Sequence, residues 1–199
     1  DAEKILELNP DGIFLSNGPG DPAAVKVAIR NIKRLIGKKP IFGICLGHQL
    51  IALALGGKTF KLKFGHRGGN HPVKNVLNGK VEISVQNPCY AVDPASLPRE
   101  VKPYFVNLND QSLEGLVHTE LPIFAVQFHP EVDHTPRGKD LLRNFAYRFC
   151  CCLGSSLMLA YAEIVVYQIL ATVKGALVIW SVDGVWDSAL SGSYGNLAV

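Results

Sequence analysis

The sequence has little that would mark an exported, fibrous or nucleic-acid-binding chain. Its formal net charge is only +3 over 199 residues, and Lys and Arg are scattered rather than gathered in blocks. Nucleic acid is therefore not an implied partner. The first ten residues, DAEKILELNP, lack the uninterrupted apolar run of a secretory signal. We expect an intracellular protein, cytoplasmic in general or in a plastid if the source is a plant.

Methionine and paired cysteines are also scarce. The only methionine is Met158, so the chain has no initiator and we interpret it as a fragment. Cysteines number five, an odd count, and three of them are adjacent, Cys150 to Cys152. This layout is a poor disulfide framework, so we expect reduced thiols.

Signatures of a metal or a nucleotide cofactor are missing. His66 and His71 have no Cys or carboxylate at zinc spacing, and Cys150 to Cys152 lack the two-residue gap of a metal knuckle. The NGPG loop that begins at Asn17 lacks the Gly and Lys spacing of a dinucleotide or phosphate loop. We expect no metal and no cofactor in this chain.

The first part of the chain alternates strands and helices. Residues 11–16 form a short apolar run that ends in the turn formers NGPGDP, and Asp21 and Pro22 predict a helix start that leads to Ile36. The apolar run 41–44 is followed by a second apolar helix that ends at two glycines. Two such units in succession predict a parallel sheet covered by helices.

The middle of the chain has a different pattern. Residues 81–86 alternate apolar and polar side chains, and residues 104–109 are a plausible antiparallel partner. Residues 121–128 indicate another buried strand, and a helix capped by Thr135 is expected to run to Phe149. The fold class is thus α/β, with an open, mostly parallel sheet flanked by helices and an added antiparallel hairpin.

The sequence divides at about residue 150. Residues 1–149 carry the α/β pattern, whereas residues 150–199 form an unassigned hydrophobic appendage. Its apolar stretch 157–173 is interrupted by Glu163 and Gln168, and a charge at a helix centre costs about 2.5–3.5 kcal/mol on insertion scales. A packed or poorly ordered appendage is favoured over a membrane span.

Cys45 has the surroundings of a nucleophile. It lies between a predicted strand and a predicted helix, with Gly43 and Gly47 two residues away on either side, the form of a nucleophile elbow. The unpaired amides of a helix N-terminus favour the thiolate form of such a cysteine. The alternative is a buried structural cysteine.

Two further loops supply what a cysteine nucleophile needs. His129 and Glu131 follow a buried strand, and in a parallel sheet they would emerge at the same edge as Cys45. The glycines of residues 17–21 and the amide of Leu46 could bind an oxyanion. A surface histidine and a plain turn are the alternatives for each loop alone, but together the loops indicate a catalytic site.

The motifs also resemble those of a known family. In order and spacing they resemble the amidotransferase domain of the carbamoyl phosphate synthetase small chain, a branch of the class I glutamine amidotransferases. The resemblance covers residues 1–149 and rests on the motifs SNGPGDP, FGICLGHQL, KFGHRGGNHPVKN and VQFHPE.

The resemblance implies an activity and a set of site residues. Cys45 would be the nucleophile, His129 the base and Glu131 its orienting partner in hydrolysis of glutamine to glutamate and ammonia through a cysteinyl thioester. The glutamine pocket would include Gly18, Gly20, Leu46, Gln49, Asn87 and Tyr90. The ammonia would serve carbamoyl phosphate synthesis, for arginine and pyrimidines, on a separate large chain that uses ATP and bicarbonate.

Departures from the family pattern leave two alternatives open. Pro88 and Cys89 stand where the family has His and Gly or His and Asn, which motivates a catalytically inactive amidotransferase-like subunit. Residues 132–145 resemble the guanosine monophosphate synthetase amidotransferase instead, which motivates a role as the ammonia donor of that enzyme. Residues 150–199 resemble neither.

Overall fold

The computed structural model describes residues 1–132, 135, 137–149 and 176–179. Its helices are α1 (Ala2–Glu7), α2 (Lys26–Leu35), α3 (Leu46–Ala54) and α4 (Gly138–Phe149), with 3₁₀ turns at Pro22–Ala24 and Pro94–Ser96. Its strands are β1 (Gly12–Leu15), β2 (Ile41–Ile44), β3 (Lys58–Lys61), β4 (Gly68–Asn75), β5 (Val81–Gln86), β6 (Tyr90–Asp93), β7 (Val101–Asn107), β8 (Leu113–His118), β9 (Ile123–Val126) and β10 (Ala176–Ile179).

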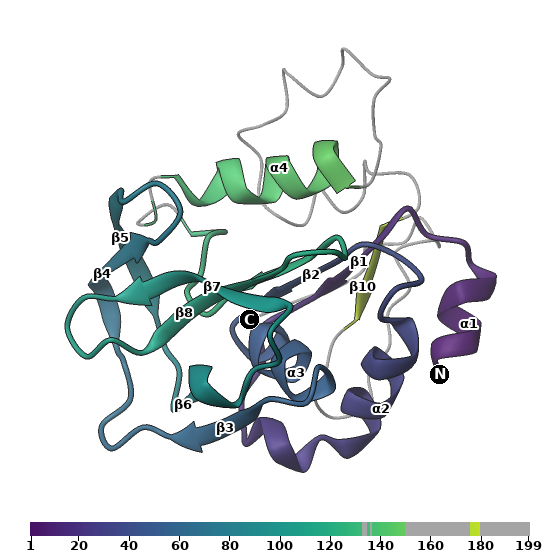
Figure 1. The fold of residues 1–199 in the computed structure, drawn as a ribbon, viewed down its shortest axis with the longest axis horizontal. Helices are drawn as coiled ribbons and strands as arrows, with labels where there is room; N and C mark the ends of the chain where they lie inside the picture. Colours follow the sequence, from purple (N-terminus) through teal and green to yellow (C-terminus); the bar gives the residue numbers. More distant parts are fainter. Residues whose placement is uncertain (133–134, 136, 150–175, 180–199) are drawn as a thin grey trace, which may run out of the picture.

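One mixed sheet organises the molecule. Its strand order is β10-β1-β2-β9-β8-β7-β4-β5, and a separate ribbon pairs β3 with β6. β10, β1, β2 and β9 run parallel, and from β9 to β5 each neighbouring pair is antiparallel. The expected α/β class is confirmed, and the antiparallel part is larger than a single hairpin. Helices α2 and α3 lie on one side of the sheet and α4 on the other (Figure 1).

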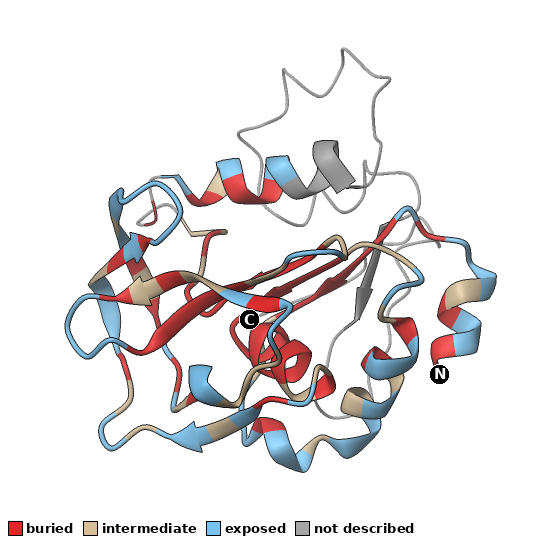
Figure 2. Ribbon diagram, in the orientation of Figure 1, coloured by how far each residue is buried: buried red, intermediate tan, exposed pale blue. Residues whose placement is uncertain are grey.

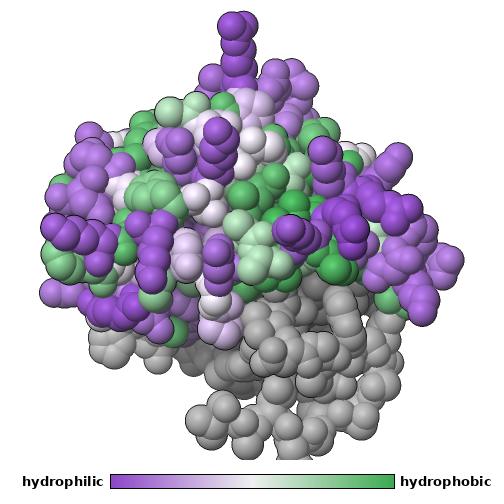
Figure 3. Space-filling view, turned by 90° about the horizontal axis from the view of Figure 1, so that it is seen from below, coloured by the Kyte–Doolittle hydropathy of each residue, from purple (hydrophilic) through white to green (hydrophobic). Residues whose placement is uncertain are grey.

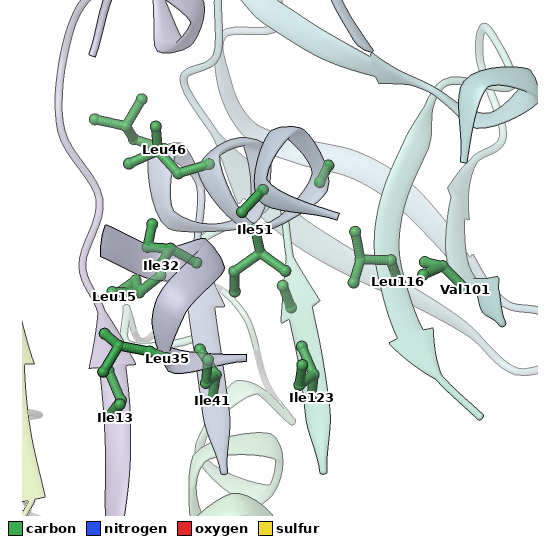
Figure 4. Packing of buried hydrophobic residues seen from close by; sticks show 14 of the residues in the cluster. Ile13, Leu15, Ile32, Leu35, Ile41, Leu46, Ile51, Val101, Leu116 and Ile123 are labelled. Carbon is green, nitrogen blue, oxygen red and sulfur yellow. The ribbon is translucent and has the colours of Figure 1, made fainter. Parts of the chain in front are cut away.

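The parallel strands alternate their side chains between two buried faces. Ile13, Ile41 and Ile123 are aligned across β1, β2 and β9 and belong to the core that packs against α2 and α3 (Figure 4). These strands are buried along their whole length, as Figure 2 shows in red. Burial on both faces explains why the sequence shows continuous apolar runs rather than alternation.

An aromatic layer fills the opposite face. Phe14, Phe42 and Phe124 are aligned in the same register and belong to the second core, together with Leu141 and Leu142 of α4. The ring centroids of Phe42 and Phe124 are 4.4 Å apart. Such a contact adds about 0.5–1.5 kcal/mol beyond burial of area.

The antiparallel half corrects one expectation. Residues 81–86 do form a strand, β5, but it pairs with β4, and β4 in turn pairs with β7. The expected direct pairing of 81–86 with 104–109 is therefore wrong. The intervening strand was missed because Gly68, Gly69 and Pro72 are poor strand formers, and the register shifts between Gly68 and His71.

Two helix starts differ from expectation. Asp21 accepts a hydrogen bond from the amide of Ala23, as a cap does, but the resulting 3₁₀ turn ends at Ala24 and α2 begins separately at Lys26. At the other helix, α4 begins at Gly138, and the Thr135 hydroxyl donates to the carbonyl of His129 instead.

Strand β10 forms the edge of the sheet beyond β1. β10 pairs in parallel with β1, Gly12 opposite Ala176, so the appendage contributes a strand to the sheet. The expectations for Cys150 to Cys152 and for the stretch 157–173 lie outside the described residues, and the division at residue 150 stays a prediction.

Among described residues no helix is long and apolar enough to span a membrane. Seen from below, hydrophilic side chains project around apolar areas (Figure 3).

Helix α3 lies unusually close to two strands, and two glycines make this possible. A Cβ on Gly43 would lie 2.7 Å from the carbonyl carbon of Gly47. A Cβ on Gly47 would overlap the carbonyl oxygen of Leu15 in β1. Both obstacles are backbone atoms, which cannot rotate away. The glycines around Cys45 therefore set the distance between helix and sheet.

Substituting Gly47 by Ala tests this close approach. Alanine raises intrinsic helix propensity by about 1 kcal/mol, but overpacking against backbone costs about 3 kcal/mol, so we expect a net loss near 2 kcal/mol in the free energy of unfolding. Urea denaturation measures it. Gly37→Ala is the control, since its Cβ meets nothing within 4 Å and only its φ of +76° is unfavourable. A Gly47→Ala protein more stable than wild type would contradict the packing described.

Candidate active site

Cys45 occupies a sharp turn between β2 and α3. Its backbone has φ 52° and ψ −103°, a conformation that residues other than glycine rarely adopt. Its amide donates to Val126 of β9 at 2.9 Å, and its carbonyl accepts from Gln49 at 3.2 Å. The residue is 7% exposed. The turn thus holds the cysteine at the helix start in the manner of a nucleophile elbow.

The N-terminus of α3 and the loop after β1 meet at one sheet edge. Leu15 is aligned with Gly43, so the loop that holds Gly18 and Gly20 follows β1 at the edge where Cys45 follows β2. As the first residue of α3, Leu46 has no intrahelical acceptor for its amide. Its side chain lies in the core. Glutamine binding by these residues stays a prediction.

His129 and Glu131 complete a triad with Cys45. The strand before them, β9, is parallel to β2 and ends at the same edge. Nδ1 of His129 lies 2.7 Å from Oε1 of Glu131, and His129 is also hydrogen-bonded to the Cys45 side chain. The structure thus brings together the three residues that the sequence analysis expected to be catalytic.

The charge state of His129 follows from these contacts. Burial alone would lower its pKa, but the hydrogen bonds to Cys45 and Glu131 and the negative charge of both partners raise the pKa to about 10. The imidazole is therefore protonated at neutral pH. A cationic histidine beside the cysteine favours an ion pair between imidazolium and thiolate.

A support that the sequence analysis missed holds the His129 backbone. Thr135 donates from its hydroxyl to the carbonyl of His129 at 2.8 Å and accepts from the amide of Val85 at 3.2 Å. Gly138 lies so close to Pro130 that a Cβ would overlap the Pro130 carbonyl oxygen. The sequence pattern indicated only a helix cap at Thr135, because these contacts depend on where β5 lies.

A buried polar network lies behind Cys45. Gln49, only 3% exposed, donates from Nε2 to the carbonyl of Tyr90 and to Oε1 of Gln127, both at 2.8 Å. Nδ1 of His48 lies 3.3 Å from the same Gln127 oxygen. Burial lowers the pKa of His48 to about 4, against a raising effect of Gln127, so His48 is neutral. The predicted pocket residues Gln49 and Tyr90 are thus joined through the Tyr90 backbone.

Asn87, the remaining predicted pocket residue, is exposed. It follows Gln86 at the end of β5 and precedes Pro88. The carbonyl of Val85, two residues before it, accepts from the amide of His129 at 2.9 Å. Asn87 therefore lies in a segment that begins beside the triad, and its contact with glutamine stays a prediction.

His66 and His71, weighed above as metal ligands, have other partners. The ring centroids are 5.1 Å apart. Nε2 of His71 lies 3.0 Å from the Arg67 carbonyl oxygen, and His66 faces Gln86 and Asp110. Within the described residues, no group of three His, Cys, Asp or Glu side chains is arranged to hold a metal ion.

Replacing Glu131 by Gln should lower the pKa of His129. The loss of an adjacent carboxylate charge shifts the pKa of a partly buried histidine by about 1–2 pH units. NMR titration of the histidine ring resonances measures the pKa of His129 in the wild type and in the Glu131→Gln variant. Glu100→Gln, at an exposed site, is the matched control. An unchanged His129 titration in Glu131→Gln would contradict the hydrogen bond.

Stability should change with pH in a defined direction. The folded pKa of His129, about 10, lies above the ordinary 6.5, so folding favours its protonated form. This contribution to the free energy of unfolding is complete below pH 6.5 and is lost as the pH rises through about 10. The stability difference between wild type and Glu131→Gln should therefore shrink over that window, as measured by urea denaturation.

Comparison with known proteins identifies relatives of the whole described domain. The profile of the family "Glutamine amidotransferase class-I" matches residues 1–149. The carbamoyl phosphate synthase small chain of Akkermansia muciniphila is 57% identical over 145 residues, 72% of this chain and 39% of that protein. The chloroplastic small chain of Oryza sativa is 56% identical over 140 residues, 70% of this chain and 31% of that protein.

Solved structures with the same fold include two amidotransferase-type proteins. A Thermoplasma acidophilum protein described as belonging to a GMP synthase is 30% identical, with a TM-score of 0.64 over 80% of each chain. A Thermotoga maritima glutamine amidotransferase is 22% identical, with a TM-score of 0.51 over 75% of this chain and 70% of that one, and shows the fold alone.

The extent of these matches decides what they establish. The chain spans between 31% and 39% of the length of the two small chains compared above, so activities of those whole proteins are not transferred by the comparison. The family profile, however, covers the entire segment that carries Cys45, His129 and Glu131. The chain belongs to the class I glutamine amidotransferase family.

Proposed function

We propose that this domain hydrolyses glutamine to glutamate and ammonia, with Cys45 as nucleophile. The observation that carries the proposal is the contact of His129 with both Cys45 and Glu131 at the carboxyl edge of the parallel strands. A cysteine activated by a cationic histidine is suited to acyl transfer. Membership of the amidotransferase family supports glutamine as the acyl donor.

The geometry supports a thioester mechanism. The Cys45 thiolate attacks the side-chain amide carbon of glutamine, and the oxyanion that forms is bound by amides such as that of Leu46. The C–N bond then breaks, and the His129 imidazolium donates its proton to the departing nitrogen to give ammonia. Glu131 stabilises the imidazolium while it holds this proton.

The second half of the cycle restores the enzyme. Neutral His129 removes a proton from water, and the resulting hydroxide attacks the γ-glutamyl thioester. The C–S bond breaks, glutamate leaves, and the Cys45 thiolate and His129 imidazolium are regenerated. The sum is glutamine plus water giving glutamate plus ammonia, so no cofactor is needed for this step.

The ammonia, in this proposal, serves carbamoyl phosphate synthesis. Relatives that are 56–57% identical over this domain are named carbamoyl phosphate synthase small chains, which supports this branch. A separate large chain would receive the ammonia and bind ATP and bicarbonate, for arginine and pyrimidine production. We propose a cytoplasmic location. The rice relative is named chloroplastic, so a plastid location applies if the source is a plant.

The second candidate is the ammonia donor of guanosine monophosphate synthetase. The Thermoplasma structure, described as belonging to a GMP synthase, favours it, but its identity of 30% is well below the 57% of the Akkermansia small chain. Adding purified partner enzymes separates the two. Glutamine-dependent carbamoyl phosphate formation with the large chain supports the first candidate, and amination of xanthosine monophosphate supports the second.

Glutamate release should depend on Cys45 and His129. Because a triad acts as a unit, we expect Cys45→Ser and His129→Asn each to lower kcat by about 10³-fold or more. An enzyme-coupled assay for glutamate measures this loss. His118→Asn is the histidine control, since His118 accepts from the amides of Glu120 and Leu121 at the end of β8. Equal activity in wild type and Cys45→Ser would overturn the proposal.

A folded but inactive wild-type protein would favour the alternative of a catalytically inactive chain. The variant Pro88→His with Cys89→Gly then restores the residues usual in the family. Activity gained in this variant would place the defect in the pocket. Continued inactivity that the large chain relieves would instead show dependence on the partner.

A further inference from the structure

The segment 85–90 is anchored on both sides of the candidate site. At one end the Val85 carbonyl accepts from the amide of His129 at 2.9 Å. At the other end the Tyr90 carbonyl accepts from Nε2 of Gln49 at 2.8 Å, which fixes it to helix α3. Residues 86–89, which we call the wall segment, therefore span from the His129 loop to helix α3, which follows Cys45.

A second loop holds the wall segment from outside. The amide of Leu62 donates to the Cys89 carbonyl at 2.8 Å, and the amide of His66 donates to the Pro88 carbonyl at 3.0 Å. Arg67 adds a side-chain contact to each residue, to the Pro88 carbonyl and to the Cys89 sulfur, both at 2.9 Å. These four hydrogen bonds join the loop to residues 88 and 89 of the wall segment.

The loop 62–67 packs closely against the wall segment. Gly65 has φ +69°, and a Cβ at this position would lie 2.9 Å from both the Pro88 carbonyl oxygen and a guanidinium nitrogen of Arg67. A glycine is required here for conformation and for space. The position of this loop therefore determines the position of the wall segment.

His66 fixes the loop to the antiparallel part of the sheet. Its Nδ1 lies 2.7 Å from the amide oxygen of Gln86 and 3.4 Å from Oε1 of Glu114, and its Nε2 lies 2.8 Å from Oδ2 of Asp110. Gln86 donates from its own Nε2 to Ser84, so its oxygen faces the histidine. Since both ring nitrogens face acceptors only, the ring carries two protons and a positive charge.

The charges around His66 agree with this geometry. Glu114 is fully buried and contributes most to raising the pKa of His66, to about 9, with Asp110 adding to the effect against the opposing effect of burial. Burial opposes the ionised form of Asp110, but the hydrogen bonds from Ser112 and His66 lower its pKa. The cluster is therefore an ion pair at neutral pH, tied to the β7–β8 turn.

We propose that the His66–Asp110 ion pair is a positioning device for the wall segment and thereby sets the affinity of the site for glutamine. The pair acts through the loop 62–67 and through Gln86, and neither member touches Cys45, His129 or Glu131 in the described structure. Its loss should therefore displace one boundary of the site while the triad keeps its geometry. The part that concerns glutamine rests on the proposed function.

The variant Asp110→Ala tests this role. If the wall segment is held less firmly, glutamine should lose binding energy equivalent to about one hydrogen bond. KM for glutamine should therefore rise about tenfold, while kcat stays within about threefold. The control is Asp11→Ala, which removes the same charge at an exposed site. Urea denaturation of both variants measures any loss of global stability separately.

A second readout does not need glutamine hydrolysis. Cys89 is exposed and held by Arg67, so its alkylation by iodoacetamide, followed at this residue by mass spectrometry, reports on the wall segment. Under native conditions Asp110→Ala should alkylate Cys89 several-fold faster than wild type does. A merely structural role would lower the unfolding midpoint without changing KM or this rate.

Arg67→Met provides an independent variant if Asp110→Ala does not fold. Arg67 is exposed, and its loss removes the side-chain contacts with Pro88 and Cys89 while the ion pair stays intact. Like Asp110→Ala, it should raise both the KM for glutamine and the rate of Cys89 alkylation. Unchanged KM and unchanged alkylation in the folded variants would overturn the inference. A wild-type protein without glutaminase activity would refute the proposed function alone, because alkylation still decides whether the pair positions the segment.

Discussion

The backbone conformation of Cys45 is the constraint on which the rest of the site depends. A residue with a Cβ at φ 52° is disfavoured by about 1–2 kcal/mol, so neighbouring packing must hold it there. That packing is the contact of α3 with β1 and β2, which only glycine at positions 43 and 47 permits. The buried face of α3 outweighs the strain. As a result the sulfur is placed at a helix N-terminus, facing the loop that follows β9.

Two histidines close to this turn show how environment sets charge. His129 lies beside Cys45 and Glu131, and its pKa of about 10 keeps it protonated at neutral pH, whereas His48, three residues after Cys45, has an amide oxygen near Nδ1 and is neutral. The pKa values of the two rings differ because Glu131 lies beside His129, whereas burial is the main influence on His48. In the proposed mechanism, a proton that passes through His129 therefore has no competing site of similar pKa at His48.

The sequence indicated the parts of the site that depend on local pattern, and missed those that depend on register. Continuous apolar runs marked β1, β2 and β9, and the flanking glycines marked the turn at Cys45, because these signals lie within a few residues of each other. The strand 68–75 was missed because its glycines and proline favour turns. Contacts such as Thr135 with His129 join residues whose proximity follows only from the complete strand order.

Pro88 and Cys89 depart from the family pattern, yet the contacts around them do not depend on the residues they replace. The hydrogen bonds from the loop 62–67 use the carbonyl of Pro88, which proline retains, and not the amide, which proline lacks. Cys89 is held through its own carbonyl and offers its sulfur to Arg67. The backbone acceptors at positions 88 and 89 are ones that any residue would supply. A change at positions 88 and 89 therefore alters two side chains while these backbone hydrogen bonds stay in place.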